Sequence, residues 1–149
     1  MDNLIAKASV IVGAPVDRVW AALITPSIIQ RYMFGATVRS DFREGSPITW
    51  RGEWKGKSFE DKGQIRRVEP RRLLEYTHFS SLSGEADKPE NYHSVSVELT
   101  DLGHRTRVTL TQSNSASEEA RQHSERNWSM MLASLKRVVE EDARPRSQA

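Results

Sequence analysis

The sequence contains no cysteine among its 149 residues. Without thiols it can form no disulfide framework, zinc–cysteine site or iron–sulfur cluster, and it has no cysteine nucleophile. No stretch approaches the roughly 20 consecutive apolar residues of a membrane-spanning helix. Residues 1–7 show no basic segment followed by a long apolar run, so we expect no signal peptide. These absences favour a cytoplasmic protein without a membrane span.

Neither sign of charge dominates the sequence. Lys and Arg number 22 and Asp and Glu number 20, which leaves a formal net charge of +2. Acidic and basic residues alternate, as in residues 51–55 (RGEWK), whereas nucleic-acid binders gather basic residues into a stripe or patch. We therefore expect a solvated charged surface and no nucleic-acid partner.

The common catalytic and metal-binding motifs are missing as well. No serine lies in a Gly-x-Ser-x-Gly elbow, and there is no glycine-rich phosphate loop. The histidines His78, His93, His104 and His123 form no His-x-His or His-x-x-x-His pair. The motifs therefore predict no metal, no cofactor and no catalytic residue.

A chain of this length fits one domain, for which folding buries roughly 68–70% of the surface of the unfolded chain. We expect a single domain over residues 1–149, with an ordered core over about 4–141 and a polar tail over 142–149. Residues 4–12 alternate as a strand. Pro15 and Pro26 then open two short helices, whose apolar faces extend to Leu23 and Met33.

From residue 35 to about 112 the apolar period changes to two, which predicts an antiparallel meander. Leu73 and Phe79 break the alternation of the strand over 73–79, so its register stays open. Residues 80–91 predict a loop. Ser117 can cap a final helix that extends to Glu141, about 37 Å long. Its apolar stripe consists of Trp128, Met131, Leu132, Leu135, Val138 and Val139.

Several short stretches in order carry a family resemblance. They are GAPVDRVWAAL (13–23), GQIRRVEPRRL (63–73), TRVTLTQ (106–112), and Asn127-Trp128 followed by Leu132, Leu135 and Lys136. Together they resemble the START/Bet v 1-like (SRPBCC) superfamily. The last stretch is similar to the branch related to the C-terminal domain of the activator of Hsp90 ATPase. Asn127 and Tyr32 depart from the usual Gly and Trp of that pattern.

The resemblance implies an α+β helix-grip fold: a curved antiparallel sheet of about seven strands, two short helices after the first strand and a long C-terminal helix. It also implies an apolar cavity between sheet and helix, with Met33 and Phe34 at its mouth. Inward strand residues and the near face of the last helix would line that cavity. The predicted ligand-binding residues are Met33, Trp50, Trp54, Tyr76, His78, His93, Val95, Val97, Gln112, Trp128, Met131, Leu132 and Leu135.

We therefore predict a protein that binds a small hydrophobic molecule, such as a lipid, a polyketide or an aromatic metabolite, in this cavity. Two alternatives stay open: a module that contacts an Hsp90-type chaperone, and a cyclase-, aromatase- or hydrolase-like enzyme. An enzyme would be favoured if His78 or His93 lay in the cavity beside a second ionisable group. The sequence fits a monomer or a homodimer.

Overall fold

A computed structural model describes residues 4–143, apart from the side chains of Trp54 and Ala143. The strands are β1 (Leu4–Val12), β2 (Thr37–Ser40), β3 (Pro47–Trp54), β4 (Lys57–Glu69), β5 (Leu73–His78), β6 (His93–Asp101) and β7 (Thr106–Ser115). The helices are α1 (Val16–Ile24), α2 (Pro26–Tyr32), the short 3₁₀ helix η1 (Pro89–Asn91) and α3 (Glu118–Ala143).

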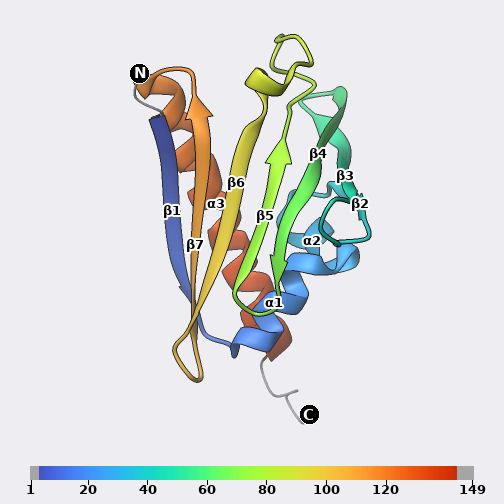
Figure 1. Ribbon diagram of the computed structural model, residues 1–149. Helices are drawn as coiled ribbons and strands as arrows, with labels where there is room; N and C mark the ends of the chain where they lie inside the picture. The colour runs from blue at the N-terminus through green and yellow to red at the C-terminus, as the bar shows by residue number, and fades with distance from the viewer. Residues whose placement is uncertain (1–3, 144–149) are drawn as a thin grey trace.

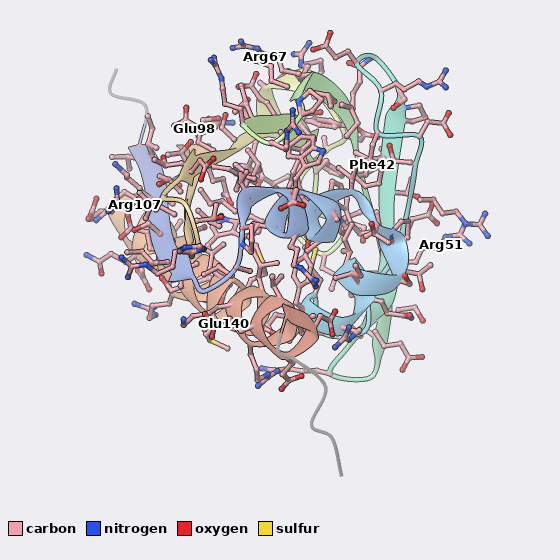
Figure 2. The ribbon with its side chains drawn as sticks, turned by 90° about the horizontal axis from the view of Figure 1, so that it is seen from below. Phe42, Arg51, Arg67, Glu98, Arg107 and Glu140 are labelled. Carbon is pink, nitrogen blue, oxygen red and sulfur yellow. The ribbon has the colours of Figure 1, made fainter. Side chains whose placement is uncertain are left out.

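All seven strands form one antiparallel sheet in the order β1-β7-β6-β5-β4-β3-β2. The sheet curves around α3, and α1 and α2 lie on the same face near one end (Figure 1). Charged side chains such as Arg51, Arg67 and Arg107 point outward from the sheet (Figure 2). The predicted helix-grip fold is therefore confirmed.

The strands β6 and β7 show the predicted alternation most clearly. Their inward residues are buried and their outward neighbours are more exposed. The buried residues include Val95, Val97, Leu99, Thr106, Val108, Leu110 and Gln112. These two strands form the centre of the surface on which α3 packs.

The register of β5 is settled by what covers each face. Leu74 and Tyr76 face α3, and so does His78 at the end of the strand. Phe79 points the other way and stacks on Tyr92, with ring centroids 5.2 Å apart and planes tilted by 28°. The segment before β6 therefore covers Phe79, one of the two apolar residues that broke the alternation.

The strand β4 begins at Lys57, before the stretch 63–73 that carries the family resemblance, because residues 57–62 pair with β3. Only Phe59 and Asp61 of this extension are shielded, so no apolar run marked it in the sequence. A Cβ atom at Gly63 would lie 1.7 Å from the carbonyl oxygen of Thr77. This close approach lets the extension continue beside the end of β5.

The helix α3 holds 26 residues and is about 39 Å long. Ser117 caps it as predicted, because its Oγ accepts a hydrogen bond from the backbone N–H of Ala120 at 3.1 Å. Every residue of its predicted apolar stripe from Met131 to Val139 is buried, while Trp128 is half-buried. No α3 residue before Met131 is buried.

Polar side chains of α3 also cover the outer edge of β1. A bare strand edge would expose unpaired backbone groups. The covering bonds are Lys7 N–H to Glu125 Oε2 (3.0 Å), Gly13 N–H to Glu140 Oε2 (2.7 Å) and Lys136 Nζ to the Ile11 carbonyl (3.1 Å). They fix the position of α3 along the sheet.

We predict that Gly63→Ala lowers the free energy of unfolding by at least about 3 kcal/mol, because a backbone atom blocks the new methyl group. Gly52→Ala is the matched control. Its nearest atom is the end of the Phe59 ring at 3.0 Å, which can move. Urea denaturation of both variants measures the difference, and equal losses would contradict the steric account.

Candidate functional site

The space enclosed between the sheet and α3 is almost filled by side chains. The cavity there has a volume of about 30 Å³, which holds a water molecule or two but no lipid. The predicted internal site is therefore too small for its ligand in this structure. Seven predicted residues line it: Met33, Trp50, Tyr76, Val97, Met131, Leu132 and Leu135.

An open hollow of about 340 Å³ adjoins this cavity, and Met33 and Met131 line both. We call it the inner part of the α3 groove. It lies beside the first half of α3, in which no residue before Met131 is buried. Its lining is Met33, Phe34, His78, Ser80, His93, Gln112, Ser124, Asn127, Trp128 and Met131.

A second hollow of about 560 Å³ continues the groove outward, and Phe34, Ser80 and Asn127 line both parts. We call it the outer part of the α3 groove. Three of its large apolar side chains are exposed to solvent: Phe34 is 64% exposed, Met130 61% and Leu82 45%. Such a cluster is typical of a surface that contacts a ligand or partner. Phe59 and Asp61 complete its lining.

Phe34 has a backbone conformation that is unusual for a bulky residue. Its φ angle is +56°, in the left-handed region, and Gly35 follows at +86°. This conformation costs a non-glycine residue about 1–2 kcal/mol. The end of α2 imposes it, because the N–H of Gly35 bonds to the Gln30 carbonyl at 2.9 Å. The strain places an exposed aromatic ring over the groove, as strained residues at binding sites often do.

His78 pairs with the carboxylate of Asp61. The His78 Nε2 and Asp61 Oδ2 atoms lie 3.0 Å apart, and Asp61 Oδ1 also accepts hydrogen bonds from the N–H and hydroxyl of Ser81. Burial raises the pKa of Asp61, but the bonds from His78 and Ser81 together bring that pKa below its ordinary 3.8. Asp61 is therefore ionised at neutral pH, and the His78 Nε2 atom carries a proton towards it.

His93 lies directly opposite His78 in the pairing of β5 with β6. Its Nδ1 atom is 2.9 Å from the carbonyl oxygen of Ser113. A carbonyl only accepts, so Nδ1 donates. Each imidazole thus uses one nitrogen in a hydrogen bond within the protein. The other nitrogen of each ring has no hydrogen-bond partner within residues 4–143.

Gln112 completes a polar cluster with the two histidines. Its Oε1 atom accepts the indole N–H of Trp128 at 2.5 Å. The amide Nε2 atom then remains, and it donates to no described residue of the chain. Gln112 is 8% exposed, so this cluster sits at the bottom of the groove. We call His78, His93 and Gln112 the polar floor.

One predicted binding residue packs in the core instead of lining the site. Val95 lies between Tyr76 and Gln112 across the sheet but is completely buried, so it packs the core and lines neither cavity nor groove. The side chain of Trp54 lies outside the described residues. Trp20 in α1 is buried and belongs to the core.

The sequence also left several groove residues unnoticed. Phe59 and Asp61 belong to the part of β4 that the alternation did not reveal. Leu82 lies in the polar loop, and Met130 lies outside the apolar stripe of α3. The available signal was weak, because Leu82 and Met130 are each an isolated large apolar residue in a polar setting.

Residues 4–143 contain neither a metal-binding cluster nor a membrane-spanning helix. No three His, Cys, Asp or Glu side chains in this range gather closely enough to hold a metal ion. None of its helices combines the length and apolar character needed to cross a membrane. The polar floor instead suits hydrogen bonding to an organic molecule.

The model of the family described as activator of Hsp90 ATPase homolog 1-like protein matches residues 13–140. The chain belongs to this family. Protein ChR145 from Cytophaga hutchinsonii is 50% identical, with a TM-score of 0.82 over 95% of this chain and 98% of that chain. No curated protein gives a significant match.

Structures with lower sequence identity share the fold of this chain. DynU16, from the dynemicin biosynthetic locus, is 21% identical, with a TM-score of 0.77 over 93% of this chain and 48% of that one. The Aha1 dimer from Colwellia psychrerythraea is 19% identical, with a TM-score of 0.71 over 97% and 100%. At these identities the two neighbours establish the fold alone.

We predict that Asp61→Asn destabilises the protein by about 1–3 kcal/mol at neutral pH, because it removes charged hydrogen bonds. The pKa of Asp61 is lower in the folded state than in the unfolded state. Its carboxylate therefore stabilises the fold above pH 3.8, and this stabilisation is lost as the pH falls through the lowered pKa. The stabilities of wild type and variant should converge in acid. Denaturant titrations across pH measure this, with the exposed Asp41→Asn as control. A constant difference down to low pH would contradict it.

Proposed function

We propose that the protein binds a small, largely apolar molecule in the α3 groove. The observation that carries this proposal is the pair of joined hollows, about 340 and 560 Å³, with apolar sides above a small polar floor. Ligand sites commonly have volumes of about 300–1,000 Å³ and this combination of surfaces. The family membership supports the same function.

The exposed side chains of the outer groove supply a driving force for binding. Phe34, Met130 and Leu82 hold apolar surface in water, and covering it gains about 25 cal/mol per Å². The inner groove adds Met33, Met131 and the half-buried Trp128. A ligand therefore gains most from an apolar part that follows the groove outward. The filled interior beneath needs no rearrangement for such a complex.

One contact favours a second function, proton transfer to or from the bound molecule. His78 is oriented by the ionised Asp61 and lines the groove opposite His93. A carboxylate that orients an imidazole is the usual arrangement of a general base. The sequence analysis gave an imidazole beside a second ionisable group as the feature that would favour an enzyme, and His78 beside Asp61 is such a pair.

Protein partners are the remaining alternative. The family name refers to an Hsp90 ATPase activator, and the Colwellia neighbour is described as a dimer. The exposed Phe34 and Met130 would also suit a protein surface. The two joined hollows and the polar floor fit a small molecule, and they give the ligand proposal the stronger support.

We predict that Phe34→Asn weakens binding of N-phenylnaphthylamine, an uncharged fluorescent aromatic probe, by roughly tenfold. Asparagine tolerates positive φ, so the fold is kept while the apolar cover is lost. Leu102→Asn removes an exposed leucine from the β6–β7 turn and should leave affinity unchanged. Fluorescence titration measures both variants. No binding to the wild type, or equal binding to both variants, would reject the proposal.

A further inference from the structure

We infer that the polar floor of the α3 groove holds a carboxylate, and that the ligand is a small apolar organic acid bound with its charged end inward. This inference rests on the proposed function, because it names the ligand class for the same groove. It follows from the charges, the donors and the exposure along the groove.

The inner groove contains no charged group that would compete with a ligand carboxylate. Its lining includes no Asp, Glu, Lys or Arg. The adjacent carboxylate of Asp61 already accepts hydrogen bonds from His78 and from both the N–H and the hydroxyl of Ser81. The lining of the inner groove therefore presents no fixed negative charge to a ligand carboxylate.

Hydrogen-bond donors are available at matching positions. Gln112 is nine-tenths buried, and its Nε2 atom is left without a partner among the described residues because Oε1 holds Trp128. His93 uses Nδ1 for Ser113, so its protonated form offers Nε2–H. An amide donor and an imidazolium donor suit the two oxygens of a carboxylate, and charge-assisted bonds are the stronger kind.

The register of the sheet brings these groups together. His78 and His93 are direct partners in β5 and β6, where side chains lie about 4.5–5.5 Å apart. Gln112 pairs with Val95, two residues beyond His93, so Gln112 and His93 are diagonal neighbours at about 7–8 Å or less. One head group can therefore contact donors from two adjacent strands, β6 and β7.

The exposure of the lining sets the direction of the ligand. Gln112 is 8% exposed at the floor, whereas Phe34 and Met130 are 64% and 61% exposed at the outer end. An apolar tail gains by covering those side chains. An ammonium head group would face the Gln112 N–H and, with His93 in its protonated form, no acceptor on that ring, whereas an alcohol would gain no charge-assisted bond. The arrangement therefore selects carboxylate over alcohol, and alcohol over amine.

Titration calorimetry with octanoate, octanol and octylamine near neutral pH tests this order. We expect octanoate to bind roughly tenfold more tightly than octanol, and octylamine to bind weakest. Contacts from the octanoate tail methyl to Met130, seen by nuclear Overhauser effects, should show the inward head group. Equal affinities for octanoate and octanol, or a tail methyl beside His93, would overturn the inference.

Gln112→Glu provides the sharpest variant. The substituted carboxylate keeps an oxygen for the Trp128 N–H but replaces the floor donor with a negative oxygen. We expect octanoate affinity to fall at least about tenfold while octylamine affinity rises. Gln122→Glu makes the same charge change at an exposed α3 position and should alter neither affinity. Equal changes in the two variants, or an equal loss of octanoate and octanol binding in Gln112→Glu, would overturn the inference.

Failure of this inference and failure of the proposed function give different results. If octanoate does not bind, or binds no better than octanol, the acid class is wrong. If N-phenylnaphthylamine still binds and responds to Phe34→Asn, the groove remains a site for apolar molecules. If neither octanoate, octanol nor the naphthylamine binds, the proposed function fails as well.

Discussion

The two-part attachment of α3 to the sheet is the constraint on which the groove depends. From Met131 to Val139 the helix packs by an apolar stripe, which closes the interior to about 30 Å³. Before Met131 no helix residue is buried, and Glu125 instead bonds to the backbone of Lys7 in the edge strand β1. Because no residue of this first half is buried, the end of β5, the start of β6 and the end of β7 line an open groove there instead of a filled core.

Much of the fold could be predicted because burial alternates in the sequence itself. The residues of β6 and β7 carry that pattern cleanly, and Ser117 marks the start of α3 through its cap. The first half of β4 could not be predicted, because few of its side chains are shielded and it shows no apolar alternation. Its position depends on the close approach at Gly63, a tertiary contact that no local pattern encodes.

Part of the lining of the α3 groove could be predicted from the sequence, but the shape of the groove could not. His78, His93, Gln112 and Trp128 face inward because strand and helix periods place them there. Whether inward residues surround a void or fill it depends on packing distances of a few ångströms, which periodicity does not supply. The pairing of His78 with Asp61 joins positions 17 residues apart, and it arises only because β4 continues past Gly63 beside the end of β5.

The polar floor owes its chemistry to bonds that also hold the fold. A buried polar group is costly unless it is paired, so each floor residue commits one atom to a structural partner. The His78 bond to Asp61, the His93 bond to Ser113 and the Gln112 bond to Trp128 use one atom of each bifunctional side chain. These bonds determine which nitrogen of each side chain remains available, and they hold that nitrogen at the surface of the groove. Side chains with two polar atoms can thus serve packing and recognition together, which a serine hydroxyl or a lysine in the same position would not do with a defined direction.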